Sequence, residues 1–149
     1  MTEHQLPSSS EAVAQAAATV LGDPRLGSFL VAVVAGEVVG VAYVAFLQSM
    51  EHAATIPLLE ELFVVPEHRG NGAGSALLRS AIEQFSTAPG LPMELEVDAS
   101  HRGVESFYHR HGFTLRQRSR WIHWPRAKAA SPVGDEGMTH GPHSKRTSQ

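Results

Sequence analysis

Three glycines alternate with other residues near the middle of the chain, in the segment Arg69-Gly70-Asn71-Gly72-Ala73-Gly74. An apolar stretch precedes this segment and a helical pattern follows it. The first turn of a helix has backbone N–H groups without intrahelical partners, and the helix dipole favours an anion there. Glycine lets the backbone take positive φ angles and approach a ligand closely. We therefore predict a phosphate-binding loop with Arg69 adding positive charge; the alternative is a turn whose glycines only reverse the chain.

Two adjacent carboxylates, Glu60 and Glu61, precede the loop in the same apolar stretch. Successive side chains of a strand point to opposite faces, so we predict that the two glutamates lie on opposite faces of a sheet. Glu60 would then share its face with Leu62 and Val64. A carboxylate in this position can act as a general base or attract a cationic substrate.

The histidines and the absence of cysteine limit the other chemistry. The chain has nine histidines and no cysteine, which excludes disulfides, thiolate metal sites and a cysteine nucleophile. His109 and His111 are two residues apart on a predicted helix, so they diverge, and no carboxylate pair completes a metal site. His140 and His143 lie near the C-terminus. We expect no metal ion.

Bulk composition narrows the class of protein. A length of 149 residues with 42% hydrophobic residues fits one ordinary domain. The net charge of −3 argues against a nucleic-acid partner, and we expect Arg116, Arg118 and Arg120 to form a solvated face. No apolar run approaches the ~20 residues that cross a bilayer, and the N-terminus lacks a signal-peptide pattern. We expect a cytoplasmic protein without a membrane partner.

Hydrophobic periodicity predicts the elements that position these residues. Ser8 and Glu11 have capping-box spacing ahead of a helix that ends at Gly22. A hairpin of two valine-rich strands follows, at Phe29–Ala35 and Val38–Leu47, with Gly36-Glu37 as its turn. Because both strands are nearly continuous in apolar character, we expect the hairpin to be covered on both faces.

The second half of the chain alternates between strand and helix patterns. The predicted elements are a strand ending at Val65-Pro66, a helix from Gly72 to Phe85, a short strand at Met93–Val97, a helix with Gly112 at its C-terminal end, and strands at Phe113–Gln117 and Trp121–Trp124. This order predicts a mixed α/β (α+β) fold, a mostly antiparallel sheet flanked by helices, in a single domain of residues 1–126. We expect residues 127–149 to be a disordered tail. Trp121 and Trp124 would pack at the sheet edge or at a subunit contact in a possible homodimer.

The glycine spacing also allows a dinucleotide site. Gly70-x-Gly72-x-x-Ser75 is an incomplete dinucleotide fingerprint, with serine in place of the third glycine. Asp98 could then serve as the acid that binds the ribose. The loop follows a hairpin, however, instead of opening a parallel βαβ unit, which disfavours this alternative.

Two stretches of the chain resemble signatures of the GNAT superfamily of N-acetyltransferases. The stretch Leu62–Gly74 resembles motif A of that family, and the family's Arg-x-x-Gly-x-Gly/Ala signature is matched by Arg69, Gly72 and Gly74. The stretch Phe107–Phe113 is similar to the family's Tyr-x-x-x-Gly-Phe element. The resemblance covers roughly residues 29–124, and it implies the mixed sheet predicted above.

The resemblance implies acetyl-CoA as the co-substrate, with its pyrophosphate held by the amides of the loop. The coenzyme-binding residues that it implies are Phe63, Val64, Val65, Arg69, Gly70, Asn71, Gly72, Ala73, Gly74 and Ser75. The backbone N–H of Val64 or Val65, freed where the strand bends away, would polarise the thioester oxygen.

The resemblance also implies two catalytic side chains. Tyr108 takes the place of the family's tyrosine, which donates a proton to the leaving sulfur. Helical spacing alone would instead pack Tyr108 on the core beside Phe107. The strand Leu59–Val64 is similar to that of polyamine acetyltransferases, which implies Glu60 as the general base, acting directly or through water; the alternative is that Glu60 and Glu61 only attract a cationic substrate or face solvent.

The expected function is therefore transfer of an acetyl group from acetyl-CoA to a primary amine by direct attack in a ternary complex. The expected acceptor is a small molecule, such as a polyamine-like compound or an aminoglycoside. A protein N-terminus or lysine stays open as the acceptor. A non-catalytic acyl-CoA-binding module is the competing class.

Overall fold

The computed structural model describes residues 9–98 and 102–126. Its helices and strands are α1 (Ser10–Gly22), β1 (Gly27–Val34), β2 (Glu37–Ser49), β3 (Ala54–Val64), η1 (Pro66–His68), α2 (Ala73–Phe85), β4 (Glu94–Leu95), η2 (Arg102–Val104) and α3 (Glu105–Arg110). The chain separates into two compact units, Met1–Leu115 and Arg116–Gln149, and all of these elements belong to the first. Among the described helices, none is long and apolar enough to cross a membrane.

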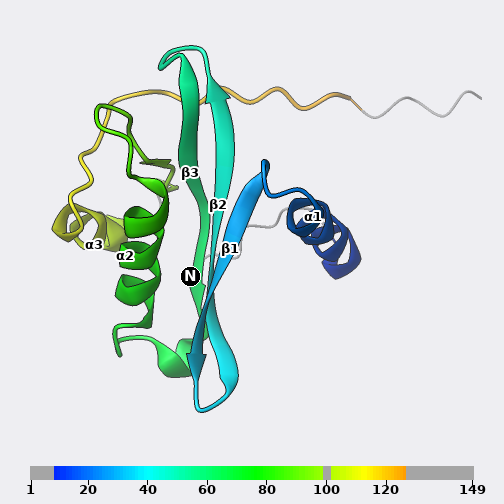
Figure 1. Ribbon diagram of the computed structural model, residues 1–149, viewed down its shortest axis with the longest axis vertical. Helices are drawn as coiled ribbons and strands as arrows, with labels where there is room; N and C mark the ends of the chain where they lie inside the picture. Colours follow the sequence, from blue (N-terminus) through cyan, green and yellow to red (C-terminus); the bar gives the residue numbers. More distant parts are fainter. Residues whose placement is uncertain (1–8, 99–101, 127–149) are drawn as a thin grey trace, which may run out of the picture. The chain divides into compact units, whose positions relative to one another are not determined.

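The four strands form one sheet in the order β1-β2-β3-β4 (Figure 1). The pairs β1–β2 and β2–β3 are antiparallel, whereas β4 runs parallel to β3. The parallel pair requires a crossover connection, which α2 supplies. The predicted mixed, mostly antiparallel sheet flanked by helices is confirmed.

The turn of the first hairpin lies one residue earlier than predicted. Ala35 and Gly36 both have positive φ angles, 51° and 82°, and β2 begins at Glu37. A two-residue turn with two positive φ angles matches the right-handed twist of the strands it joins. The prediction placed the turn at Gly36-Glu37, whereas the structure uses Ala35, a residue type that rarely adopts a positive φ angle.

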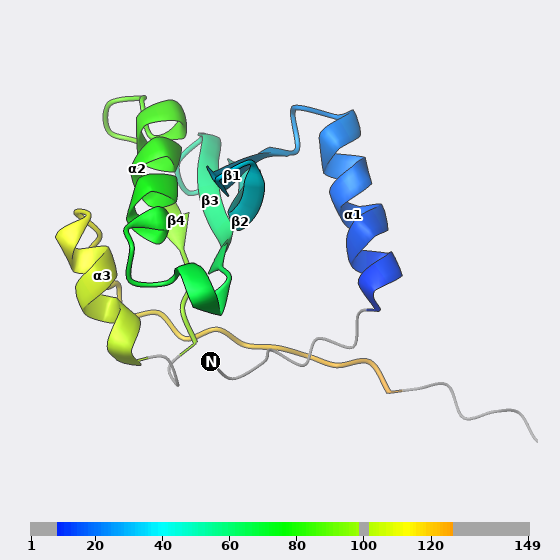
Figure 2. The same cartoon turned by 90° about the horizontal axis from the view of Figure 1, so that it is seen from below.

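The hydrophobic core lies between the sheet and α2. On the sheet it contains Ala42, Val44 and Leu59, and on the helix Leu77 and Leu78. Figure 2 shows α2 and α3 on one face of the sheet and α1 beyond β1 on the other. We call the face that carries Ala42 and Val44 the helix face, and the opposite one the open face.

The open face of the hairpin is only partly covered, which corrects the prediction of cover on both faces. Val31 and Val33 of β1 are 54% and 56% exposed. The helix α1 contacts β1, but it has no buried residue of its own. The continuous valine pattern therefore reflects strand propensity as well as burial.

The N-terminus of α1 has a side-chain cap. The hydroxyl of Ser9 accepts a hydrogen bond from the backbone N–H of Ala12 at 3.2 Å. The predicted cap, Ser8, lies outside the described residues. The neighbouring serine supplies the same chemistry, so the predicted helix is confirmed with a cap at Ser9.

The predicted final strand pair is absent from the described residues. Residues 113–126 form neither helix nor strand. Trp121 and Trp124 are 92% and 69% exposed, and their packing at a sheet edge or at a subunit contact stays a prediction. The apolar alternation that predicted these strands creates no partner strand by itself. The predicted tail, residues 127–149, lies outside the described residues.

Candidate active site

The N-terminus of α2 leaves its first backbone N–H groups without a side-chain cap. Gly72 is the N-cap residue, with a φ angle of 86°, and the first helical bond runs from Ala76 N to Gly72 O at 2.9 Å. Among the described residues no side chain caps this helix. The N–H groups of Ala73, Gly74 and Ser75 therefore point beyond the helix end, where the dipole favours an anion.

The three alternating glycines have different roles. Gly70 and Gly72 have positive φ angles, 77° and 86°, and a Cβ atom at either would meet open space. Gly74 belongs to the predicted loop with the other two, but it lies inside α2 and has no positive φ angle. A Cβ there would lie 3.8 Å from Val64 Cγ2 and 3.9 Å from Phe107 Cζ, which is ordinary contact. Backbone conformation therefore requires glycine only at the first two positions.

A hollow of about 340 Å³ adjoins this helix end. Asn71, Gly72 and Ala73 of the loop line one side, and Val34 of β1 lines another. His68 of η1 also contributes to its wall. The hollow places open space beside the uncapped N–H groups, as binding of a phosphate requires.

Arg69 ties the loop to the end of β3. Its Nε donates a hydrogen bond to the carbonyl oxygen of Val64 at 2.8 Å, and its guanidinium carbon lies 5.5 Å from the centre of the Phe63 ring. A charge-assisted hydrogen bond and a cation–π contact hold the side chain in place. The positive charge predicted beside the loop is thus fixed against the strand.

Among the described residues, the outer edge of β3 has no partner strand beyond its midpoint. β4 pairs with β3 only through Leu58 with Glu94 and Leu59 with Leu95. The Val65 N–H donates to Val39 O at 2.8 Å, so the prediction that it is freed is wrong. Neighbouring residues of an antiparallel strand direct their N–H groups to opposite edges, so the Val64 N–H points toward the unpaired edge.

A β-bulge separates Glu60 from the regular alternation of β3. Tyr43 of β2 pairs with Glu61, whereas Val44 pairs with Leu59, so Glu60 is the extra residue. Leu59 and Leu62 therefore share the helix face, and Glu60 does not share it with Leu62 as predicted. The simple alternation rule failed because one residue is inserted at this point.

The bulge brings Glu60 close to Tyr43. Burial raises the pKa of Tyr43, and the negative charge of Glu60 raises it further. Tyr43 alternates with Ala42 and Val44 of the core, so its ring lies on the open face. Glu60 and Glu61 are both exposed. Both carboxylates therefore border the unpaired stretch of β3 from the open face.

Tyr108 lies on the other side, packed against the core. It is half-buried, and its ring makes edge contacts with Phe107 and Phe113 at centroid distances of 5.2 and 5.9 Å. Burial raises the pKa of its phenol above the ordinary value of 10.0. The phenol is thus fully protonated near neutral pH, the state that a proton donor requires.

The Tyr-x-x-x-Gly-Phe element has a structural explanation of its own. Gly112 has a φ angle of 87° just after α3, and its N–H donates to His109 O at 3.0 Å. The Phe113 N–H donates to Tyr108 O at 3.1 Å. These two bonds make a Schellman motif, in which the ring contact between Tyr108 and Phe113 is the usual hydrophobic partner. The element therefore orients Tyr108 whether or not the phenol reacts.

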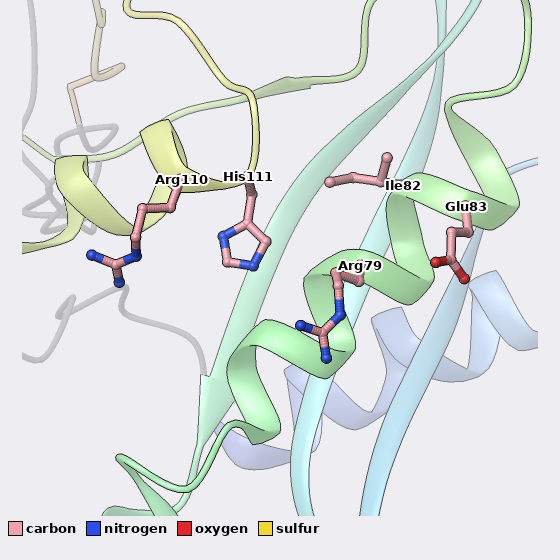
Figure 3. A pocket seen from close by; sticks show the side chains of 5 residues that line it. All are labelled: Arg79, Ile82, Glu83, Arg110 and His111. Carbon is pink, nitrogen blue, oxygen red and sulfur yellow. The ribbon is translucent and has the colours of Figure 1, made fainter.

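The two histidines of α3 bind backbone carbonyls. His109 Nδ1 lies 3.0 Å from Phe113 O, and His111 Nδ1 lies 2.8 Å from Phe107 O. A second hollow, of about 300 Å³, lies between α2 and α3, and Figure 3 shows His111 with Arg79 and Arg110 around it. None of the predicted site residues lines it. Within the described ranges, no three potential metal ligands are grouped together.

The structure places the predicted site residues on two faces of the sheet, and neither Tyr108 nor Glu60 lines the hollow at the N-terminus of α2. The glycine loop and Tyr108 lie on the helix face, and Glu60 lies near Tyr43 of the open face. Sequence reasoning missed the pair of Phe29 and Tyr43, whose rings stack on the open face at 4.8 Å. The register of the hairpin, in which Phe29 lies directly opposite Tyr43, could have revealed this pair.

A family model described as an acetyltransferase (GNAT) domain matches residues 25–115, more than half of the chain. The aminoalkylphosphonate N-acetyltransferase of Salmonella typhimurium is 36% identical over 78 residues, 52% of this chain and 51% of that protein. An uncharacterized N-acetyltransferase of Methanocaldococcus jannaschii is 37% identical over 59 residues, 40% of this chain and 26% of that protein. The matches thus span 51% and 26% of the lengths of these two curated relatives.

The fold also matches solved structures. A possible acetyltransferase from Clostridium difficile superposes with a TM-score of 0.69 at 15% identity, over 80% of each chain. Identity this low establishes a shared fold alone. The matched region of the family model ends at residue 115, where the first compact unit also ends.

Proposed function

The chain belongs to the GNAT acetyltransferase family, and we propose that it is an enzyme that transfers the acetyl group of acetyl-CoA to a primary amine of a small molecule. The observation that carries the proposal is that, in the part of the chain that the structure describes, the N-terminus of α2 has no side-chain cap and the nearby edge of β3 has no partner strand. The first feature suits a pyrophosphate, and the second leaves backbone groups available to an extended chain.

The residues of the loop fit the donor. The N–H groups of Ala73, Gly74 and Ser75 would bind the pyrophosphate, and the positive φ angles of Gly70 and Gly72 keep Cβ atoms away from it. Phe63, Val64 and Val65 would lie along the rest of the coenzyme. Since Val65 N–H is bound to Val39, we assign the thioester oxygen to the N–H of Val64.

The reaction is a direct transfer. The nitrogen lone pair of the acceptor forms the new C–N bond, the C–S bond breaks, and its electron pair leaves with the sulfur. The nitrogen loses one proton and the sulfur gains one, so the products are an N-acetylated amine and coenzyme A. The chain supplies orientation, which can account for much of the rate.

Two side chains are proposed to move these protons. Glu60, exposed at the bulge, would accept the proton of the amine directly or through a water molecule. Tyr108 would donate a proton to the sulfur, and its raised pKa keeps that proton in place near neutral pH. The two groups lie on opposite faces of the sheet, which suits a reaction whose two reactants meet at the gap between β3 and β4.

A non-catalytic acyl-CoA-binding module is the second candidate, because the Schellman motif gives Tyr108 a structural role without catalysis. A panel of small amines with acetyl-CoA separates the two candidates, with release of free thiol measured by DTNB. Thiol release that depends on one class of amine supports the enzyme. Tight acetyl-CoA binding without thiol release from any small amine or any peptide N-terminus would favour the binding module.

Isothermal titration tests the loop itself. We expect acetyl-CoA to bind and NAD to bind far more weakly, because serine replaces the third glycine of the dinucleotide fingerprint at Ser75. The structure removes the topological argument against NAD, since β3, α2 and β4 form a parallel βαβ unit. Tighter binding of NAD than of acetyl-CoA would overturn the proposed function.

A further inference from the structure

The second hollow, of about 300 Å³ between α2 and α3, shares no residue with the hollow beside the glycine loop. We call it the interhelix hollow. Its wall consists of Arg79, Ile82 and Glu83 on α2 and of Arg110 and His111 at the end of α3. Arg79 follows Ala73, the first residue of α2, by six residues, which corresponds to roughly 9 Å along a helix. The proposed function assigns no ligand to this hollow.

The wall of the interhelix hollow has an excess of positive charge. Arg79 and Arg110 are exposed, and within the described ranges neither has an ion pair or a side-chain hydrogen bond. Two arginines and one glutamate, Glu83, leave the wall with a net charge of +1 before His111 is counted. The guanidinium group carries a permanent charge and pairs N–H donors with the oxygens of a phosphate or a carboxylate. The wall therefore favours an anion.

His111 is held with one ring nitrogen available to the interhelix hollow. Its Nδ1 lies 2.8 Å from Phe107 O, and because a carbonyl oxygen only accepts, Nδ1 is assigned as the donor. The ring also contacts the Phe107 ring at a centroid distance of 4.8 Å. Figure 3 shows the His111 ring between Arg110 and Arg79. Nε2 has no partner in the described part of the chain, and it becomes an N–H donor when the imidazole is protonated, a form that a bound anion stabilises.

The C-terminal end of α3 does little to repel an anion from the hollow. The carbonyl groups of Phe107, Tyr108 and His109 all accept hydrogen bonds from groups that follow them in the chain. Arg110, in the last turn, offsets the negative end of the helix dipole. The charges of the side chains therefore dominate the electrostatic potential of the hollow.

We propose that the interhelix hollow binds a phosphate group, with Arg79 and protonated His111 as direct ligands and Arg110 adding positive charge from the side of α3. The ligand is inorganic phosphate or a phosphate monoester, whose organic part would contact the apolar side chain of Ile82. The phosphate would connect α2 with the end of α3, the helix that carries Tyr108. This site goes beyond the proposed function, which places the pyrophosphate of the coenzyme at residues 73–75. The 3′-phosphate of coenzyme A offers the same chemistry, so the experiment must distinguish it from a free phosphate.

The test is a titration of inorganic phosphate into the protein at constant ionic strength, followed by NMR through the ring signals of His111. Sodium chloride replaces the phosphate in the control. We expect the His111 signals to shift and to saturate at phosphate concentrations on the order of millimolar, and to stay in place with chloride. A shift that does not saturate, or an equal response to chloride, would overturn the inference.

Four substitutions test the charges of the wall. Arg79→Gln should weaken phosphate binding about tenfold and Arg110→Gln about threefold, because Arg79 is the proposed direct ligand. Glu83→Gln removes the acidic group of the wall and should tighten binding about threefold. Arg25→Gln removes an arginine charge outside the hollow and should leave binding unchanged. All four side chains are exposed, so the variants should keep the fold. Unchanged binding in Arg79→Gln, or weaker binding in Glu83→Gln, would contradict a phosphate site.

Coenzyme A and 3′-dephospho-coenzyme A identify the source of the phosphate. If only coenzyme A prevents inorganic phosphate from shifting the His111 signals, the ligand is the 3′-phosphate of the coenzyme. If phosphate still shifts these signals in both saturated proteins, the ligand is a free phosphate compound. If both coenzymes prevent the shift, the hollow is not a separate site and the inference fails. A failure of the protein to bind coenzyme A would overturn the proposed function alone, because the titration of the free protein does not depend on the coenzyme.

Discussion

Gly72 and Gly112 have nearly the same backbone conformation, with φ angles of 86° and 87°, at helix ends that use it in opposite ways. At Gly72 the helix begins, and among the described residues no side chain caps the N–H groups of its first turn. At Gly112 the helix ends, and the glycine and Phe113 donate hydrogen bonds to the carbonyls of His109 and Tyr108. The helix end at Gly72 keeps backbone N–H groups available to a ligand. The helix end at Gly112 pairs its backbone carbonyl groups within the chain.

This difference separates the two parts of the family's sequence pattern. Both motifs contain a glycine that must take a positive φ angle, so both would be retained for backbone reasons alone. Only the hydrogen-bond inventory distinguishes a binding loop from a helix cap. It follows that substitutions at the first glycine should affect binding, and substitutions at the second should affect stability.

The largest effect is expected at the uncapped end. Gly72→Val forces a β-branched side chain into a left-handed conformation, at a cost of roughly 1–3 kcal/mol, and places it next to the N–H groups that would hold the pyrophosphate. We expect acetyl-CoA binding to fall below detection in isothermal titration. Gly74→Ala is the matched control, since its Cβ makes ordinary contacts with Val64 and Phe107, and it should bind within about threefold of the parent. Equal losses in both variants would contradict the assignment.

At the capped end, chemistry must come from a side chain because the backbone is already bonded. Tyr108→Phe keeps the carbonyl that Phe113 uses and the ring contact, but it removes the proton donor. We expect kcat to fall about 10- to 100-fold with little change in the Kd of acetyl-CoA. In the parent, the raised pKa of Tyr108 should keep kcat from declining until the pH exceeds the ordinary phenol value of 10.0. Normal turnover by the variant at every pH would leave Tyr108 with its structural role only.

The sequence predicted the parts of the site that depend on local conformation. The helix after Gly72, the glycine after α3 and the core positions Leu77 and Leu78 follow from periodicity and from glycine's freedom, and the structure confirms them. The sequence did not predict the bulge at Glu60, because a bulge depends on how two strands pair and not on the order of residues in one strand.

The other missed features have the same origin. The hydrogen bond that occupies the Val65 N–H and the stacked pair of Phe29 and Tyr43 both depend on strand register. The strands predicted after Gly112 failed because alternation of apolar residues identifies a possible strand without providing its partner. The prediction therefore differed from the structure where a feature depends on pairing between segments that are distant in the sequence.

Gly112→Ala should produce a smaller change, and in stability instead of binding. Alanine in the left-handed conformation costs about 1 kcal/mol, so the free energy of unfolding should fall by that amount in urea denaturation. The Kd of acetyl-CoA should stay within about twofold of the parent, since the backbone groups at this end bond within the chain. A loss of binding comparable to that of Gly72→Val, without a change in stability, would remove the distinction between the two glycines.

The smallest effect is expected at the N-terminus of α1. This helix end tests whether a side-chain cap alone prevents a helix N-terminus from binding an anion. Ser9 already satisfies the N–H of Ala12 there, unlike the first turn of α2. Ser9→Ala should lower the free energy of unfolding by about 0.5 kcal/mol, at the low end for caps because α1 has no buried residue. Inorganic pyrophosphate, titrated by NMR, should shift the amide signals of residues 72–75 and leave that of Ala12 unchanged, because a capped N–H group has little to offer an anion. Equal shifts at the two helix ends would show that any helix N-terminus in this chain attracts pyrophosphate, and that the glycine loop adds no selectivity.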